Sequence, residues 1–539
     1  MTSKVPGPKN EPVLGYAPGS PERARQKSAL SAMAKEVLEV PLWIGGERVR
    51  TAQFADVVMP HAHASVVARA HQGTGAHTTQ AIQAALGAKS AWSRASFTDR
   101  AAVFLKAADL LAGPYRERMN AATMLGQSKT VFQSEIDAVC ELADFWRFNV
   151  HYAEALAGDQ PLSPGGTWNR VEQRPLDGFV LAISPFNFTS IAANLPTAPA
   201  LLGNVVVWKP APTQMLSAAV IVEILEAAGL PPGVINMVQG DAAAVGAPAL
   251  SSPELGGIHF TGSTATFHTL YGEVAKNLGR YRQYPRIVGE TGGKDFVFAH
   301  ASADLDALAV ALIRGAFEYQ GQKCSAASRA YVPASLWPKL KARLADEIAA
   351  IRMGDIQDFG NFMGAVIDRR AYQKISGYVE LGRGPSAKIV AGGQCDDRQG
   401  YFIAPTLVET SDPKHRLMVE EIFGPVLTVW PYPDGALDEA LDLVDTSTPY
   451  ALTGAIFARD RLVIAALSDR LRDAAGNFYI NDKPTGAVVG QQPFGGGRAS
   501  GTNDKAGSAA NLLRWISPRA IKETFAPPKD WRYPFMSEG

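Results

Sequence analysis

Hydrophobic and polar residues follow two different rhythms along the chain. Between residues 78 and 149, Ala and Leu recur every three or four positions, as in 101–111 (AAVFLKAADLL), and this spacing predicts amphipathic helices. One of these helices is expected over 134–149. From about residue 175, short runs rich in Val and Ile alternate with helical stretches such as 215–228. The expected strands are 179–183, 205–208, 234–238 and 257–260.

Strands that alternate with helices predict an α/β fold with a parallel sheet built from βαβ units. A second alternation of the same kind runs from about 297 to 475. Loops and helix N-termini gather at the carboxyl ends of parallel strands. We therefore expect an anionic ligand such as a nucleotide to bind at that edge.

Three segments do not follow either rhythm. Residues 1–50 are predicted to form an arm that leads into a short strand, 42–44, which a turn of two glycines follows. Residues 151–172 and 506–539 contain Pro and Gly but also tryptophan, so we expect structured appendages rather than free linkers.

Composition and charge narrow the possible classes of protein. The 539 residues are 46% hydrophobic and 19% charged, which is enough apolar material for a packed core. A prior of roughly 150 residues per domain predicts about three domains. The 52 basic and 52 acidic side chains cancel, and no basic run occurs. The sequence therefore predicts neither a nucleic-acid partner nor binding to a membrane surface.

Cysteine usage and the N-terminal residues bear on location. Cys140, Cys324 and Cys395 are too few and too far apart for a disulfide framework or a zinc site, which fits a reducing compartment and no bound metal. There is no apolar run of about 20 residues and no apolar core of signal-peptide type. We expect a soluble cytoplasmic protein, with the mitochondrial matrix as the alternative.

Several common functional motifs are missing. The chain has no G-x-G-x-x-G fingerprint, no G-x-x-x-x-G-K-[ST] phosphate loop, no H-E-x-x-H helix and no G-x-S-x-G elbow. These absences argue against kinase, metallohydrolase and serine-hydrolase chemistry.

Three polar segments carry the chemistry, and three others support them. The chain resembles the aldehyde dehydrogenase superfamily over about residues 40–525, with these segments in the expected order. They are 184–188 (SPFNF), 289–294 (GETGGK) and 321–325 (GQKCS), supported by 260–264 (FTGST), 420–425 (EEIFGP) and 493–496 (PFGG).

The resemblance implies a fold of three parts. It implies a Rossmann-type NAD-binding domain, an α/β catalytic domain that carries the thiol, and a small β flap for homo-oligomerisation. The corresponding ranges are 1–150 with 173–295, then 296–505, and finally 151–172 with 506–539.

Aldehyde oxidation needs a nucleophile that adds to the carbonyl and leaves a C–H bond from which hydride can depart. The thiolate of Cys324 does this and then forms a thioester. Asn187 matches the family's side-chain donor to the oxyanion, and the Cys324 backbone N–H lies beside it. Glu290 matches the carboxylate that activates water to hydrolyse the thioester. An isolated Cys is more often an inert buried thiol. The presence of the other motifs in the same chain favours a catalytic role for Cys324.

The resemblance also implies an NAD site. In the family, a Thr-Gly-Ser segment opens the helix near the pyrophosphate, a strand-end lysine binds the adenosine ribose, and a glutamate holds the nicotinamide ribose. The matching cofactor-binding residues are Ser184, Lys209, Gly240, Thr261, Gly262, Ser263, Glu421 and Phe423. Many relatives have an acidic residue three positions after the lysine. Here that position is Pro212, which leaves the choice between NAD and NADP open.

Flanking residues resemble one branch, the Δ1-pyrroline-5-carboxylate dehydrogenases, which oxidise L-glutamate γ-semialdehyde to L-glutamate in proline degradation. The stretches that carry this likeness are 126–130 (GQSKT), 135–138 (EIDA), 145–149 (FWRFN), 498–505 (RASGTNDK) and 10–13 (NEPV). The likeness implies a homo-oligomer, and any proline dehydrogenase partner would be a separate protein.

Such a substrate has an ammonium, a carboxylate and an aldehyde on a short chain. The resemblance assigns Lys323, Ser325 and the backbone of Gly486 and Ala487 to the carboxylate and aldehyde regions. It assigns Glu141 to the ammonium and two aromatic rings, Phe188 and Phe494, to the aliphatic middle. We also expect the Lys323 ammonium to favour the neighbouring thiolate.

Three other interpretations stay open from the sequence alone. One is oxidation of another small semialdehyde, such as succinate semialdehyde, which needs no anchor for an ammonium. Another is a thiol acyl-hydrolase or acyltransferase that uses Cys324 without NAD. The third is a catalytically silent protein on the same fold.

Overall fold

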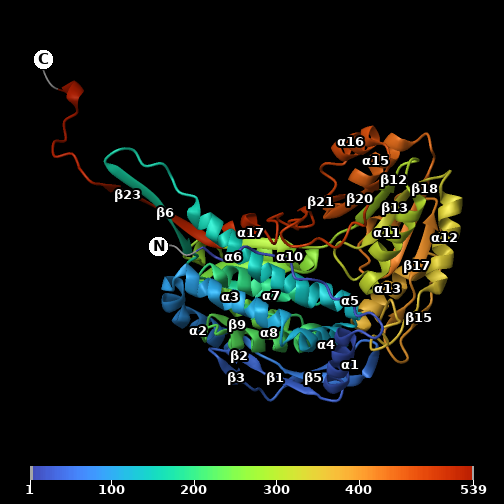
Figure 1. Ribbon diagram of the computed structural model, residues 1–539, viewed down its shortest axis with the longest axis horizontal. Coiled ribbons are helices and arrows are strands. Elements are labelled where there is room, and N and C mark those ends of the chain that lie inside the picture. The colour runs from blue at the N-terminus through green and yellow to red at the C-terminus, as the bar shows by residue number, and fades with distance from the viewer. Residues whose placement is uncertain (1–3, 537–539) are drawn as a thin grey trace.

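Two seven-stranded sheets organise the chain in the computed structural model, which describes residues 4–536 (Figure 1). Residues 1–3 of the expected arm and 537–539 of the expected C-terminal appendage lie outside the described residues. Within the described residues, no helix combines the length and apolar character that crossing a membrane requires.

The first sheet has the strand order β11-β10-β7-β8-β9-β2-β3, and its first five strands are parallel. Its strands are β7 (Phe179–Ile183), β8 (Val206–Lys209), β9 (Ile235–Met237), β10 (Leu255–Thr261), β11 (Arg286–Glu290), β2 (Leu42–Ile44) and β3 (Glu47–Val49). β2 and β3 form an antiparallel hairpin across the two predicted glycines. The predicted parallel sheet is therefore confirmed, with a hairpin added at one edge.

Helices connect the successive parallel strands. They are α7 (Thr189–Leu201), α8 (Met215–Ala228), α9 (Ala242–Ser251) and α10 (Thr264–Asn277). The chain moves outward from β7 to β9 and then returns to β10 on the other side of β7. Right-handed crossovers then require α9 and α10 to lie on the opposite face from α7 and α8. The reversal at β7 and β10 is the position where ligands of such sheets bind.

The second sheet has the order β14-β17-β18-β13-β12-β20-β21, with only β14 antiparallel to its neighbour. The strands are β12 (Asp295–Ala299), β13 (Ala327–Pro333), β14 (Ala387–Ala391), β17 (Thr406–Thr410), β18 (Val426–Tyr432), β20 (Thr453–Phe457) and β21 (Asn477–Ile480). The helices around it are α11 (Leu305–Phe317), α12 (Trp337–Ala350), α13 (Arg369–Leu381), α15 (Leu437–Thr446) and α16 (Arg461–Arg470).

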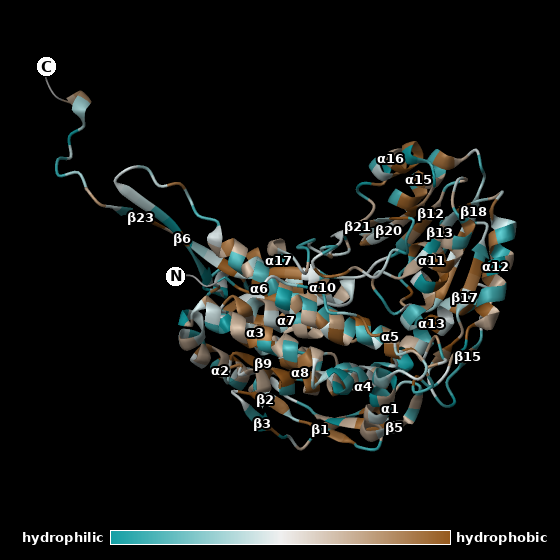
Figure 2. Ribbon diagram, in the orientation of Figure 1, coloured by the Kyte–Doolittle hydropathy of each residue, from teal (hydrophilic) through white to brown (hydrophobic). Residues whose placement is uncertain are grey.

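Helix α12 illustrates why these segments pack as they do. It buries Trp337, Leu340, Leu344 and Ile348, which are three or four residues apart and share one face. Figure 2 shows hydrophilic colours on the outer turns of α12 and hydrophobic colours toward the strands. The predicted second α/β alternation is confirmed.

The connection between the two sheets positions the candidate site. β11 ends at Glu290, its carboxyl end, and β12 begins only five residues later at Asp295, its amino end. This short crossing brings the carboxyl edge of the first sheet to the amino edge of the second. Cys324 precedes the amino end of β13, which pairs with β12, so the thiol lies at the same junction.

The predicted helix over 134–149 is wrong in detail. The structure has α5 (Val131–Ser134), a π-helix η1 (Glu135–Glu141) and α6 (Leu142–Gly158), after α2 (Gly75–Arg94), α3 (Phe97–Ala112) and α4 (Arg116–Gln127). A π-helix widens one turn, a local change that the spacing of apolar residues does not reveal. Here the Ser190 hydroxyl at the start of α7 lies 2.7 Å from an Asp137 oxygen and 2.9 Å from a Glu141 oxygen, and its single hydrogen is donated to one of them at a time.

The N-terminal arm is more ordered than the sequence suggests, whereas the appendages contain regular structure as expected. The expected arm contains α1 (Pro21–Met33) and β1 (Leu38–Val40), which joins β4 (Phe54–Met59) and β5 (Ala62–His71) in a small sheet. β6 (Thr167–Pro175) and β23 (Ile516–Thr524) pair over nine residues and project from the body (Figure 1). Short elements complete the fold: α14 (Arg416–Val419), α17 (Ala509–Leu513), β15 (Cys395–Asp396), β16 (Phe402–Ile403), β19 (Tyr450–Ala451) and β22 (Gly497–Arg498).

Candidate active site

Asn187 lies in the loop between β7 and α7, and its carboxamide is oriented by a backbone carbonyl. The Asn187 Nδ2 donates to the Gln322 carbonyl at 3.1 Å, two residues before Cys324. A carboxamide nitrogen has two hydrogens, so one remains for a ligand. Gln127 Nε2 also donates to the Phe186 carbonyl at 2.5 Å and fixes the same loop.

A buried carboxylate anchors the start of α7. Asp137 accepts hydrogen bonds from the backbone N–H groups of Thr189 and Ser190, both at 3.0 Å, and from the Ser190 hydroxyl at 2.7 Å. It also pairs with the Lys129 ammonium at 2.6 Å, and both side chains are almost completely buried. Because α7 begins two residues after Asn187, this cluster fixes the position of the carboxamide.

A strained turn precedes the thiol. Tyr319 and Gln320 have φ angles of 51° and 56°, in the left-handed region that residues other than glycine rarely adopt. The Gln320 side chain holds this turn by donating to the Ser128 and Ala365 carbonyls and accepting from the Gly364 N–H. The strain is thus offset by three buried hydrogen bonds directly before the segment that carries Cys324.

Acidic groups surround the thiol. Burial raises the pKa of Cys324 well above its usual value, and the neighbouring Asp295, Glu290 and Glu421 raise it further. Lys323 is not among the main influences on this pKa, so the expected effect of its ammonium on the thiolate is not borne out. The Lys323 ammonium instead pairs with Glu318 at 3.1 Å, so its charge is already balanced.

Glu290 is the acidic group whose geometry best fits a base. Its Oε2 atom is buried without a hydrogen-bond partner among the described residues. Burial raises the pKa of Glu290 well above its usual value, and only the Lys505 charge and a hydrogen bond from the Gly496 backbone oppose this. A carboxylate of this kind accepts a proton more readily than one in water.

Lys323 and Ser325 lie on either side of the thiol and connect it to other elements. The Ser325 and Thr485 hydroxyls are hydrogen-bonded at 2.8 Å, which joins the thiol segment to the loop after β21. Gly486 follows in this loop with a φ angle of +95°. Within residues 4–536, the backbone N–H groups of Gly486 and Ala487 have no hydrogen-bond acceptor. They remain available to a ligand.

Glu141 and Phe188 lie beside the Asp137 cluster. Burial and the charge of Asp137 raise the pKa of Glu141 to about 8, although the Ser190 hydroxyl and the charge of Lys129 oppose the rise. The Lys129 ammonium lies 4.1 Å from the centre of the Phe188 ring and 4.5 Å from that of Tyr319. Lys129 therefore stabilises the position of the Phe188 ring through a cation–π contact.

Two predicted cofactor residues meet at the ends of neighbouring strands. The Ser184 backbone N–H donates to the Lys209 carbonyl at 3.2 Å, and the Ser184 hydroxyl accepts from the Trp208 indole. Lys209 is only 8% exposed, and its ammonium has no ion-pair or hydrogen-bond partner among the described residues. Burial lowers the pKa of Lys209. A buried cation without a partner fits a site for polar groups of a ligand.

The Thr261–Ser263 segment and Glu421 connect the cofactor residues to Glu290. Ser263 caps α10, and the Gly262 N–H donates to the Glu290 carbonyl at 3.1 Å. The Glu421 carboxylate accepts from the Gly293 N–H at 3.0 Å. Phe423 meets the Phe186 ring edge-on, with centroids 5.9 Å apart. These contacts gather the predicted residues along the same sheet edge.

Two predicted residues make no hydrogen bond or ring contact with the other site residues among the described residues. Gly240 bridges Gly73 and has a φ angle of +152°, a conformation that a side chain would strain. Phe494 pairs through its backbone with Ala506 and directly precedes Gly495, which approaches Glu290.

Sequence reasoning missed several groups that shape the site. Asp137 and Lys129 belong to the stretches 135–138 and 126–130 that resemble the Δ1-pyrroline-5-carboxylate dehydrogenases. Lys294 belongs to the segment 289–294 that contains Glu290. The sequence therefore offered a way to find these three residues. The sequence offered no such indication for Asp295, which lies at the start of a buried strand outside these motifs. Burial raises the pKa of Asp295 to about 8 and lowers that of Lys294 to about 7.

Comparisons with known proteins agree with this geometry. Residues 47–521 match the model of the aldehyde dehydrogenase family. The chain is 51% identical to the mitochondrial Δ1-pyrroline-5-carboxylate dehydrogenase of Mus musculus over 529 residues, covering 98% of this chain and 94% of that protein. It is 50% identical to the Agaricus bisporus enzyme of the same name, covering 99% and 98%.

A solved structure gives the same result at the level of the fold. The Δ-pyrroline-5-carboxylate dehydrogenase of Mycobacterium tuberculosis bound with NAD superposes with a TM-score of 0.97 and 56% identity, covering all of both chains. The chain therefore belongs to the aldehyde dehydrogenase family.

Proposed function

We propose that this protein oxidises L-glutamate γ-semialdehyde, the open form of Δ1-pyrroline-5-carboxylate, to L-glutamate with NAD, as a step of proline degradation. The observation that carries the proposal is the arrangement around Cys324. Free backbone donors at Gly486 and Ala487 are tied to the thiol segment through Ser325, and Glu141 lies near Phe188 on the adjoining helix. The activity named for the mouse, fungal and mycobacterial relatives supports the same substrate.

In the proposed reaction, the Cys324 thiol gives its proton to solvent and the resulting thiolate adds to the aldehyde carbon. The free N–H of the Asn187 carboxamide and the Cys324 backbone N–H bind the resulting oxyanion. NAD, when bound, accepts hydride from that carbon and leaves a thioester on Cys324. Glu290 then takes a proton from water, and the water attacks the thioester and releases L-glutamate.

The donor set at the edge of the first sheet fits a dinucleotide. The α10 N-terminus at Thr261, Gly262 and Ser263 would hold the pyrophosphate. Lys209 would bind the adenosine ribose, and Ser184 and Gly240 would border that site. Glu421 would hold the nicotinamide ribose and Phe423 would pack beside it. Pro212 begins a short 3-10 turn and offers no charge to the ribose, and we keep NAD as the proposed cofactor.

The proposed substrate site has two ends. Lys323, Ser325, Gly486 and Ala487 bind the α-carboxylate and the aldehyde region, and Glu141 faces the ammonium. Phe188 and Phe494 enclose the aliphatic middle. Burying Glu141 without a cation is costly, and an ammonium from the substrate would offset that cost.

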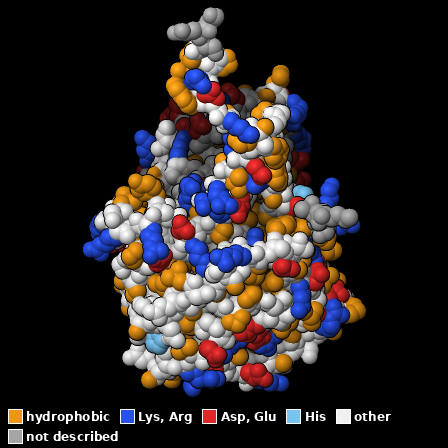
Figure 3. Space-filling view, turned by 90° about the vertical axis from the view of Figure 1, so that its left-hand side faces the viewer, with side chains coloured by type: hydrophobic (Ala, Val, Ile, Leu, Met, Phe, Trp, Pro, Cys, Tyr) orange, Lys and Arg blue, Asp and Glu red, His pale blue; other side chains and the backbone are white. Residues whose placement is uncertain are grey.

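We further propose that β6 and β23 form a flap that joins copies of this chain. The segment carries exposed apolar side chains, among them Leu162, Trp168, Phe525, Trp531 and Phe535. Figure 3 looks at this end of the molecule and shows hydrophobic side chains on the projecting segment. The proposed NAD-binding domain is then 1–150 with 173–295, the catalytic domain 296–505, and the flap 151–172 with 506–539. The cytoplasmic location, the absence of a nucleic-acid partner and a separate proline dehydrogenase stay predictions.

The direct test is NADH formation by the purified protein. Δ1-pyrroline-5-carboxylate is compared with succinate semialdehyde and with a short uncharged aldehyde, each with NAD and with NADP. We expect the highest kcat/KM for the pyrroline compound with NAD. Activity only on the other aldehydes would overturn the substrate. Thioester hydrolysis without any need for NAD would overturn the oxidoreductase proposal.

A further inference from the structure

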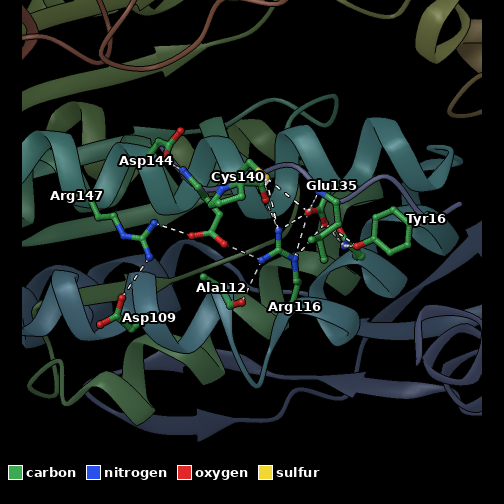
Figure 4. A network of polar contacts seen from close by, with 12 residues as sticks. Tyr16, Asp109, Ala112, Arg116, Glu135, Cys140, Asp144 and Arg147 are labelled. Atoms are coloured by element: carbon green, nitrogen blue, oxygen red, sulfur yellow. Dashed lines mark hydrogen bonds and ion pairs between the residues drawn. The ribbon is translucent and has the colours of Figure 1, made fainter. Parts of the chain in front are cut away.

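The N-terminal arm is bound to the body through carboxylates on η1 and α6. The Val5 N–H donates to Glu154 at 2.9 Å, the Glu11 N–H to Asp144 at 2.7 Å and the Leu14 N–H to Glu135 at 3.1 Å. Figure 4 shows the surrounding network, in which Arg116 and Arg147 reach toward the arm from α4 and α6. The arm thus runs along the helices that carry Glu141.

Asn10 makes a contact of a different kind. Its Nδ2 atom donates to Asp144 at 2.8 Å and to the Val489 carbonyl at 2.8 Å, and its Oδ1 atom accepts from Gln491 at 3.1 Å. One amide therefore joins α6 to the loop 485–492, which is far from both in sequence. The three bonds thus use both the nitrogen and the oxygen of a single carboxamide, the nitrogen as a double donor and the oxygen as an acceptor.

The loop 485–492 packs directly on α6. Gly490 has a φ angle of +84°, and a Cβ atom there would lie 2.2 Å from the Phe148 ring. The Gln491 and Gln492 N–H groups both donate to the Val488 carbonyl at 3.0 Å, which makes the end of the loop a tight turn. The other end of the loop is tied to Ser325 through Thr485.

The two elements that Asn10 joins carry the two ends of the proposed substrate site. Asp144 follows Glu141 by three residues on one continuous helical segment. Val489 follows Ala487 by two residues in the loop. We propose that Asn10 is a positioning residue that fixes the loop 485–492 against α6 and so determines the affinity for the amino-acid end of the substrate. This inference rests on the proposed function, because it needs Gly486 and Ala487 to bind a carboxylate.

Glu11 provides a matched control, because it attaches the arm without touching the loop. Its carboxylate pairs with Arg116 and Arg147, both at 2.7 Å. Burial raises its pKa, but the hydrogen bonds and charges of these two arginines outweigh burial and hold the pKa of Glu11 below its usual value. A Glu11→Gln variant weakens the arm, keeps the backbone bond to Asp144 and leaves all three Asn10 bonds in place.

The experiment compares wild type, Asn10→Ala, Asn10→Gln and Glu11→Gln in steady-state assays at saturating NAD. Asn10→Ala removes all three bonds. KM of this variant for Δ1-pyrroline-5-carboxylate should then rise about 10-fold, which corresponds to about 1.4 kcal/mol of substrate affinity. Its kcat should change less than about 2-fold, and kcat/KM for a short uncharged aldehyde should stay at the wild-type value. Asn10→Gln keeps the amide and should recover part of the KM. Glu11→Gln should lower the melting temperature without changing KM.

A second variant keeps the test independent of folding. Gln491 is exposed, and Gln491→Ala removes only the bond to the Asn10 Oδ1 atom, so KM for the pyrroline compound should rise about 2-fold. An unchanged KM in both Asn10→Ala and Gln491→Ala would overturn the inference, as would an equal loss on both aldehydes. If wild type itself shows no preference for the pyrroline compound over the uncharged aldehyde, the proposed function fails instead.

Discussion

Two groups of buried carboxyls in this molecule differ in whether a cation is paired with them. Asp137, Glu135 and Glu11 each form an ion pair with a lysine or an arginine. Glu290, Asp295, Glu421 and Glu141 have no ion pair among the described residues, and burial raises the pKa of each. The first group holds helices and the arm in place, and the second lines the site around Cys324 and Phe188.

The difference shows how one chain separates stability from chemistry. A buried carboxylate that is paired and accepts several hydrogen bonds costs little to keep charged, and removing its partner is expensive. A buried carboxyl without a cation holds its proton more tightly and is poised to exchange it with water or a substrate. Substitutions in the paired group should therefore mainly lower the melting temperature, and substitutions around Cys324 should mainly lower turnover.

The largest effect is expected for the thiol at the centre of the unpaired group. Cys324→Ala should lower kcat for NADH formation by at least about 10³-fold, because no other group can form the thioester. The melting temperature should stay close to that of wild type, because no hydrogen bond to the Cys324 sulfur holds the fold. Normal NADH formation by this variant would remove Cys324 from the mechanism.

Glu290→Gln should separate the two halves of the reaction. Steady-state turnover should fall by about 10²- to 10⁴-fold, the range for loss of a general base, while a pre-steady-state burst of NADH remains. The reason is that Glu290 is needed to activate water and not to transfer hydride. Rapid mixing with aldehyde and NAD in excess over enzyme measures both phases, and equal loss of burst and turnover would argue against this role.

In the paired group, Asp137→Ala should mainly reduce stability. It leaves the Lys129 ammonium buried without a partner and removes the anchor of α7, which should cost about 3–5 kcal/mol and lower the melting temperature. The double variant Asp137→Ala with Lys129→Met removes the unpaired charge and should recover much of the loss. A single variant as stable as wild type would contradict the assignment of this pair to anchoring.

These two groups also divide what the sequence could predict. The strands at 179–183 and 205–208 were predicted from apolar runs, and the residues Asn187, Glu290 and Cys324 from motifs that resemble the aldehyde dehydrogenase superfamily. The paired group was not predicted, because Asp137 and Lys129 are eight residues apart in a segment whose helical pattern looks uniform. Only the π-turn of η1 and the bonds to α7 give them a role, and those depend on tertiary contacts.

The charge balance at the thiol was the clearest failure of sequence reasoning. Lys323 is adjacent to Cys324, which suggested a cation beside the thiolate. Glu318 lies five residues earlier, across a turn with left-handed residues that folds it back onto Lys323. Asp295 begins β12, the strand that pairs with β13 in the second sheet. Neither neighbour can be found from spacing along the chain, because both depend on backbone geometry.

A smaller effect tests the electrostatics of the unpaired group. A raised pKa means that the Cys324 thiolate forms only at higher pH, so alkylation by iodoacetamide should accelerate as pH rises into the alkaline range. Glu290→Gln removes one of the acidic neighbours and should shift this rise to lower pH. Mass spectrometry of the Cys324 peptide measures the rate, with buried Cys140 in the same sample as the internal control.

The smallest effect is expected where a paired carboxylate loses one of several donors. Tyr16 donates to Glu135 at 2.7 Å, but Arg116, Asn120 and the Leu14 N–H also bind that carboxylate. Tyr16→Phe should therefore destabilise the protein by only about 1 kcal/mol and leave kcat and KM unchanged, which a melting curve and one assay would measure. A loss as large as that of Asp137→Ala would mean that the number of donors, and not the paired cation, decides stability. The two groups of carboxyls would then differ in their hydrogen bonding and not in their charge pairing.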